Sequence, residues 1–151
     1  MKRLSLFIYF FLITVLQAAA QQSFDKTAVK SVMKRVADWQ IANPNKGAEH
    51  DDLDWTHAAL YMGMLDWAEL TEKEDSDDSY YQWLLRIGQR NHFQIGKWMY
   101  HADFIAVGQP FIDLYLKYGN KKMIAPVMAR ANWVVENPAE TTLELDYGKL
   151  E

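Results

Sequence analysis

The stretch Tyr100-His101-Ala102-Asp103-Phe104-Ile105-Ala106-Val107-Gly108-Gln109 joins a polar, aromatic-rich loop to an apolar helical pattern. It predicts a helix over about residues 103–118, with Asp103 at its start. An earlier stretch repeats the arrangement, because a polar loop leads into Asp54-Trp55-Thr56-His57 and an apolar helix is predicted over about 54–70. Two carboxylates at two helix starts predict one wall of a polar pocket in an all-α protein.

Three further helices are predicted over about 25–41, 78–91 and 121–136. Their apolar residues recur at spacings of three and four, which is typical of helices with one buried face. The helices therefore alternate between one-sided and all-round apolar types. This alternation predicts a layered helical barrel in which outer helices wrap inner ones. A plain helical bundle or a solenoid of helix pairs is the alternative, although no repeat of fixed period supports a solenoid.

The loops that enter the two inner helices, 43–54 and 91–103, are long, and long loops on one rim are where a helical scaffold carries its site. The acidic run 71–77 is expected to be a solvated loop. Pro110 is expected to kink or delay its helix. Gly63, inside a predicted helix, suggests close packing or a ligand contact. The tail 141–151 is expected to be extended or irregular, with Leu143-Glu144-Leu145 alternating like a short strand.

Residues 1–20 have the pattern of a secretory signal peptide: a basic start, an apolar core and Ala18-Ala19-Ala20 before the cleavage site. A single membrane anchor is the alternative, but the apolar core is shorter than the roughly 20 residues that a bilayer span needs. The mature domain would cover 21–151 and be exported, to the periplasm or the extracellular space. Because the chain contains no Cys, its stability must come from the hydrophobic core rather than from disulfides.

The composition excludes one class of partner and suggests another. Cleavage of the leader removes Lys2 and Arg3 and so changes the formal net charge from −4 to −6, which argues against nucleic acid. Six Trp, eight Tyr and seven Phe are present. They could pack a core, or their flat rings could stack on the C–H faces of sugars beside polar groups that hold the hydroxyls.

The candidate site residues gather around the two helix starts. Asp103 is the best candidate for a catalytic carboxylate, although an ordinary helix-capping role is the alternative. The residues expected to bind substrate are Asp54, Trp55, Thr56, Tyr100, His101 and Gln109.

The sequence predicts no metal site and no cofactor. The four histidines, His50, His57, His92 and His101, are too scattered for a metal-binding spacing. There is no Gly-rich phosphate loop and no nucleophile elbow. Carboxylate chemistry, with an acid and a base acting on one bond, remains.

Several runs of residues together resemble the unsaturated rhamnogalacturonyl hydrolases, glycoside hydrolase family 105 and its neighbour family 88. The resemblance covers about residues 25–145, and the Tyr-His-Ala-Asp run followed by Gly-Gln is its most specific part. The runs that carry it are Asp54-Trp55-Thr56, Ala59-Leu60-Tyr61-Met62-Gly63-Met64, Tyr80-Tyr81-Gln82-Trp83-Leu84, Met99-Tyr100-His101-Ala102-Asp103, Val107-Gly108-Gln109 and Leu114-Tyr115.

The resemblance implies an (α/α)6 barrel that removes an unsaturated uronic acid from pectin-derived oligosaccharides. In this family an aspartate protonates the C4=C5 double bond and water adds at C5. The resulting hemiketal then opens and releases the sugar. One family aspartate, followed by x-Ile-x-x-Gly, matches Asp103 with Ile105 and Gly108.

This sequence departs from the family pattern at several points. Phe104 stands where a second Asp is common, and Pro110 lies within the inner helix. The second family aspartate, preceded by Trp and followed by a Met-containing run, has no match, because Asp146 stands before Tyr147-Gly148. A complete barrel also needs about twice the predicted helices. We therefore expect an inactive N-terminal portion, with self-association through exposed apolar helix faces. A non-catalytic helical carbohydrate-binding or interaction module is the alternative.

Overall fold

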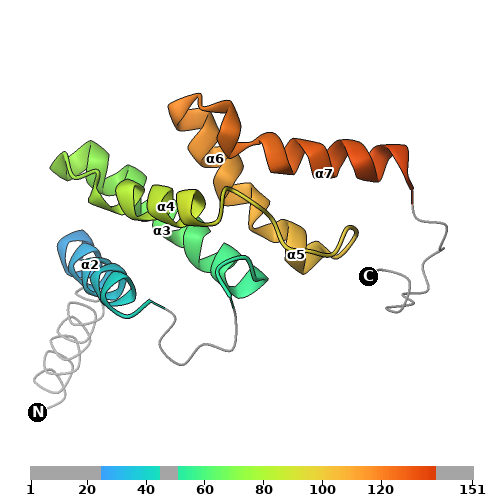
Figure 1. Ribbon diagram of the computed structural model, residues 1–151. Helices are drawn as coiled ribbons and strands as arrows, with labels where there is room; N and C mark the ends of the chain where they lie inside the picture. Colours follow the sequence, from blue (N-terminus) through green and yellow to red (C-terminus); the bar gives the residue numbers. More distant parts are fainter. Residues whose placement is uncertain (1–24, 45–50, 139–151) are drawn as a thin grey trace, which may run out of the picture. The chain divides into compact units, whose positions relative to one another are not determined.

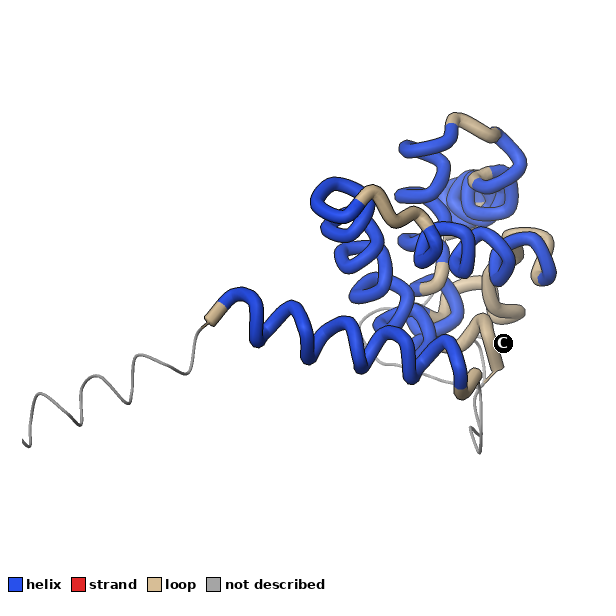
Figure 2. Tube along the Cα trace, turned by 90° about the vertical axis from the view of Figure 1, so that its left-hand side faces the viewer, coloured by secondary structure: helices blue, strands red, loops and turns tan. Residues whose placement is uncertain are grey.

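The structure is a computed structural model that describes residues 25–44 and 51–138. The predicted leader 1–20, His50 and the predicted strand-like run 143–145 lie outside these residues. The described residues form helices and loops and contain no strand (Figure 2). The chain divides into two compact units, residues 1–42 and residues 43–151.

The described part of the first unit is one helix, α2 (Lys26–Ala42), close to the predicted range. The side chain of Asp25 accepts a hydrogen bond from the Thr27 N–H at 3.1 Å, as expected of a capping residue. Lys34 and Asp38, four residues apart, form an ion pair at 2.7 Å, which supports the helix modestly. Ala37 is buried in this helix, whereas its large apolar side chains are exposed: Val29, Val32, Met33, Val36 and Trp39.

The second unit contains the helices α3 (Trp55–Asp75), α4 (Ser79–Arg90), α5 (Ala102–Ala106), α6 (Gly108–Tyr118) and α7 (Ala125–Glu136), with a short 3-10 turn, η2 (Lys121–Met123). The central helix is α3, which packs against α4, α5 and α6. Figure 1 shows α3 and α4 running side by side. The helix α7 follows η2 and begins with Pro126 in its first turn, where a missing N–H costs no hydrogen bond.

The core of this unit combines aliphatic and aromatic residues, most of them from α3, α4 and α6. The rings of Trp67 and Tyr80 meet edge to face with centroids 5.7 Å apart, and those of Phe93 and Phe111 do so at 5.3 Å. Such pairs stabilise beyond the area that they bury. The predicted inner face of α4 is confirmed, because Tyr81, Leu84, Leu85 and Gly88 are all buried.

The helix α3 runs further than predicted, to Asp75 instead of about 70. The predicted loop at 71–77 was therefore wrong for most of its length, whereas the predicted exposure to solvent is confirmed at residues 73–76. Thr71 is buried, and its hydroxyl lies within hydrogen-bond distance of the carbonyl oxygens of Trp67, Ala68 and Asp77. The helix ends at Ser76, whose φ of 56° places it in the left-handed region. The sequence did not predict this continuation, because a run of acidic residues suits an exposed helical turn as well as a loop.

The predicted helix over 103–118 is divided into α5 and α6, with the break at Val107. Pro110 explains the position of the break, because a proline ring clashes with the carbonyl four residues earlier, here that of Ala106. The proline itself is buried in the first turn of α6. The expectation that it interrupts the regular helix is confirmed.

Several expectations about burial were wrong. The buried faces predicted for α2 and α7 are largely absent, because only Ala37 is buried in the first helix and no residue is buried in the second. Gly63 is exposed, and a Cβ added at this position would meet no atom within 4 Å, so close packing does not explain the glycine and the ligand contact stays a prediction. The inner helices are also less buried than predicted, because Trp55 on α3 is 50% exposed and Leu116 on α6 is 72% exposed. None of the helices in the described residues is both long enough and apolar enough to cross a bilayer.

Candidate functional site

Asp54 caps the N-terminus of α3. Its side chain accepts a hydrogen bond from the Thr56 N–H at 3.1 Å and lies 3.4 Å from the Thr56 hydroxyl. The backbone of Asp54 is extended, as required of a capping residue. Trp55 is the first residue of α3 and presents a half-exposed indole ring. The start of α3 therefore places a carboxylate, a hydroxyl and an accessible aromatic ring together, which suits a sugar.

The two predicted long loops meet at Asp52. Its carboxylate accepts two hydrogen bonds from Arg90, from Nε and from the terminal Nη2, and one from the Asn91 side-chain amide, each 2.7 Å long. This paired geometry is the strongest form of an ion pair, and it raises the pKa of the Arg90 guanidinium. Asp52 comes from the first loop, whereas Arg90 and Asn91 end α4 and begin the second. An open pocket of about 410 Å³ lies over this junction.

Below this junction, Tyr61 is 2% exposed, and its pKa is raised, first by burial and then by the negative charge of Asp52. The folded state thus holds the phenolic proton more tightly than the unfolded chain, whose tyrosines titrate near pH 10. The resulting stability is present below about pH 10 and is lost as the pH rises towards the folded-state pKa, at up to about 1.4 kcal/mol per pH unit.

We expect Tyr61→Phe to flatten this alkaline loss, because the variant has no proton to release. Urea unfolding midpoints measured from neutral pH to about pH 11 would show the difference. Tyr115→Phe, on the partly exposed side of α6, is the matched control and should follow the wild type. Parallel pH curves for wild type and Tyr61→Phe would contradict the expectation.

Asp103 lies in the first turn of α5, and its side chain is 53% exposed. His101 immediately precedes this helix, and its Nδ1 atom lies 3.9 Å from the Asp103 Oδ2 atom. The His101 ring also packs against Trp98 and Phe104, with centroids 5.1 and 5.4 Å apart. The carboxylate is therefore open to solvent on one side and flanked on the other by an imidazole held between aromatic rings.

Phe104, which stands where the family pattern has a second Asp, acts as a packing residue. Its carbonyl accepts a hydrogen bond from the Gly96 N–H at 2.7 Å, and its ring lies 4.7 Å from that of Trp98. A Cβ at Gly96 would overlap the Phe104 ring, so only glycine fits there without displacing it. Phe104 thus packs the 96–101 loop against α5.

Arg130 of α7 fastens the same loop from the other side. Its guanidinium donates hydrogen bonds to the carbonyl oxygens of Gly96 at 2.7 Å, Trp98 at 2.6 Å and Met99 at 3.4 Å. Partial burial lowers the pKa of this arginine, but the group stays charged throughout the physiological range. We call this set of contacts the Arg130 clamp.

The side chains of Tyr100 and Gln109, also predicted to bind substrate, contact other residues instead. The Tyr100 hydroxyl donates to the carbonyl of Asn137, and its ring packs against Trp133 with centroids 5.4 Å apart. The Gln109 amide lies 3.4 Å from a carboxylate oxygen of Asp113, one turn along α6. The structure therefore brings His101 and Asp103 together, and separately Asp54, Trp55 and Thr56. The helices that carry the two groups, α3 and α5, pack against each other.

Sequence reasoning missed Asp52, Arg90, Trp98 and Arg130. The polar loop that contains Asp52 pointed to the region, but an ion pair across 38 residues has no local signature. Within residues 25–44 and 51–138, no three His, Asp or Glu side chains gather closely enough to hold a metal ion. Around the Asp103 carboxylate the structure places the His101 imidazole and the rings of Trp98 and Phe104.

The family model described as Glycosyl Hydrolase Family 88 matches residues 15–144, which is most of the 151-residue chain. The chain therefore belongs to glycosyl hydrolase family 88. Its all-α fold agrees with part of the family's helical toroid, as predicted, and its family supports a glycosidase that acts on an oligosaccharide. No curated protein and no solved structure matches the chain.

Proposed function

We propose that this chain forms the substrate-binding wall, and one of two aspartates, of a glycosidase for rhamnogalacturonan-derived oligosaccharides. The reaction removes an unsaturated uronic acid by hydration: a proton adds to C4 of the C4=C5 double bond and a hydroxyl from water adds to C5. The hemiketal formed in this way opens and releases the remaining sugar. The observation that carries the proposal is the open Asp103 carboxylate beside His101, within the stretch that the family covers.

Each residue has a role in this proposal. Asp103 holds or delivers the proton at the double bond, because its exposed carboxylate is within reach of a bound ligand. His101 lies beside that carboxylate, with its Nδ1 atom 3.9 Å from the Asp103 Oδ2 atom, and offers a second polar group to a bound sugar. Trp55 offers a flat surface for a sugar ring, and Asp54 and Thr56 offer hydrogen bonds to its hydroxyls. Tyr100 and Gln109 would join the binding wall only by exchanging their contacts with Asn137 and Asp113 for contacts with the sugar.

The experiment is a titration of the 151-residue chain with an unsaturated galacturonyl-rhamnose disaccharide. Calorimetry reports binding, and the ultraviolet absorbance of the double bond reports turnover. We expect binding without turnover, because the second family aspartate has no counterpart in this sequence. Loss of the double-bond absorbance would show that the chain is active by itself, and a lack of any binding would count against the proposed site.

Trp55→Ala is expected to weaken binding of this disaccharide roughly fivefold, since stacking on an aromatic ring contributes about 1 kcal/mol. Calorimetric dissociation constants measure the change. Trp39→Ala is the matched control, because Trp39 is a similarly exposed indole on α2 and has no part in the proposed site. Equal effects of the two substitutions would contradict a role for Trp55.

The second candidate function is a non-catalytic carbohydrate-binding module. The observation that favours it is the half-exposed Trp55 in a chain that lacks the second aspartate. The same titration separates the two functions when repeated with the saturated disaccharide. A site built for hydration should prefer the planar unsaturated ring, whereas a simple stacking module should bind both sugars equally.

A further inference from the structure

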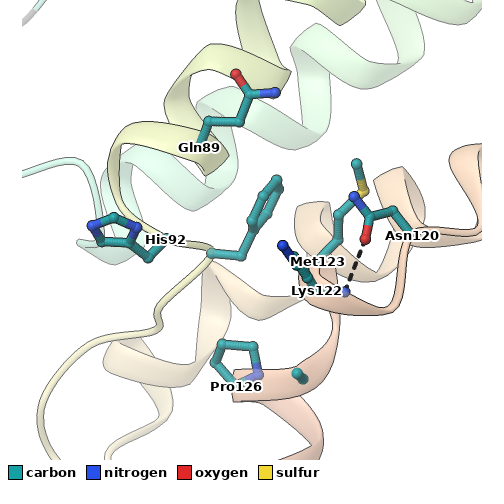
Figure 3. A pocket seen from close by; sticks show the side chains of 8 residues that line it. Gln89, His92, Asn120, Lys122, Met123 and Pro126 are labelled. Atoms are coloured by element: carbon teal, nitrogen blue, oxygen red, sulfur yellow. Dashed lines mark hydrogen bonds between the residues drawn. The ribbon is translucent and has the colours of Figure 1, made fainter.

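A second pocket lies at the other end of the 91–101 loop from Asp103. It is open, has a volume of about 470 Å³, and separates the end of α4 from the segment that joins α6 to α7 (Figure 3). Its lining residues include none of the residues proposed for the Asp103 site. Any ligand bound here would therefore occupy a separate position.

The floor of this pocket is apolar and fixed. Phe93 and Met123 are both buried, and both line the pocket together with Pro126. The Phe93 ring packs on Phe111 and covers Gly88 so closely that a Cβ there would overlap the ring. The floor is held by the core of the unit, so it does not need a ligand to form.

The rim of the pocket is polar and positively charged. Figure 3 shows Gln89 and His92 on the side of α4, with Asn120 and Lys122 opposite. The Asn120 side chain accepts a hydrogen bond from the Lys122 N–H at 3.1 Å, which fixes the backbone that carries the lysine. Among the described residues that line the pocket, none has a carboxylate. Lys122 therefore brings a positive charge without an acidic neighbour in the pocket wall.

A ligand that matches these features has a flat apolar face, several hydroxyls and one negative charge. The apolar floor suits the C–H face of a sugar ring, the amides of Gln89 and Asn120 suit its hydroxyls, and Lys122 suits a carboxylate. We propose that this pocket binds a hexuronate unit of an acidic oligosaccharide, at a position separate from Asp103. The inference rests on membership of a glycosyl hydrolase family and not on the proposed reaction.

The test uses the full chain with ¹³C-labelled methionine methyl groups, titrated with trigalacturonate and followed by NMR. Met123 lies in the pocket, whereas Met99 lies in the loop held by Arg130 before Asp103. We expect the Met123 methyl resonance to move and Lys122→Glu to weaken that response about tenfold, since a hydrogen bond to a charged group is lost and a repulsion is added. Fully methyl-esterified trigalacturonate, which has no negative charge, should bind the wild type about as weakly as trigalacturonate binds Lys122→Glu.

Lys121→Glu is the matched control, because Lys121 is the neighbouring exposed lysine and does not line the pocket. An equal loss in Lys121→Glu and Lys122→Glu would overturn the proposal in favour of unspecific charge attraction. No movement of Met123 would overturn it directly. Movement of Met99 alone, abolished by Asp103→Asn, would place the sugar at the Asp103 site and also overturn it. Failure of the Asp103 site, with Met123 still responding, would leave this inference standing.

Discussion

Phe111→Ala is expected to lower the free energy of unfolding by about 3–5 kcal/mol, the range for removing a buried aromatic side chain. Phe111 lies on α6 and is 1% exposed. Its ring meets that of Phe93 edge to face, so its loss removes buried area, an aromatic pair and the support beneath the 91–101 loop. The remaining cavity cannot close easily, because Phe111 lies in the core of the unit, on a helix that packs against α3.

Urea unfolding followed by far-ultraviolet circular dichroism measures this loss. Phe111→Leu retains most of the buried volume and should cost much less. Leu116→Ala on the same helix is the matched control, because Leu116 is largely exposed, and its effect should lie within about 0.5 kcal/mol. If Phe111→Ala cost no more than Leu116→Ala, the second unit would not have the core described above.

Arg130→Ala is expected to lower the free energy of unfolding by about 2 kcal/mol, because the Arg130 clamp is lost and the carbonyls of Gly96 and Trp98 lose a charged donor. Arg130→Lys should restore only part of this stability. A single ammonium group lacks the planar fork that reaches two carbonyls at once. The effect should be concentrated in the 96–101 loop.

Hydrogen exchange locates that effect. The Gly96 N–H, which donates to the Phe104 carbonyl, should exchange faster in Arg130→Ala by more than the change in global stability requires. Arg86→Ala, at an exposed position of α4, controls for loss of a surface arginine and should leave both measurements unchanged. Unchanged Gly96 exchange in Arg130→Ala would show that the clamp does not hold the loop.

The helices were predictable because their causes are local. The spacing of Leu84, Leu85 and Gly88 marked the buried face of α4, and Pro110 marked the interruption between α5 and α6. Where burial decides, prediction failed. Thr71 is buried near the end of α3, with its hydroxyl within hydrogen-bond distance of the Asp77 carbonyl, and nothing in the acidic run 71–77 distinguishes that outcome from a loop.

The candidate site shows the same division. The positions of Asp54 and Asp103 in first turns or caps of helices follow from their neighbours in sequence. The junction of Asp52 with Arg90 and Asn91 does not, because it joins two loops whose approach depends on how α3 packs against α4. The role of Arg130 could not be predicted for a further reason. Its partners are main-chain carbonyls, which every sequence possesses.

The bonding of Arg130 to main-chain carbonyls also affects which substitutions the protein can accept. A guanidinium that donates hydrogen bonds to main-chain oxygens does not depend on the side chains of the residues that it binds. Met99 could therefore be exchanged, by natural variation or by an engineer, while the segment keeps its course. The contour of the surface beside Asp103 can therefore change at Met99 without rebuilding the scaffold.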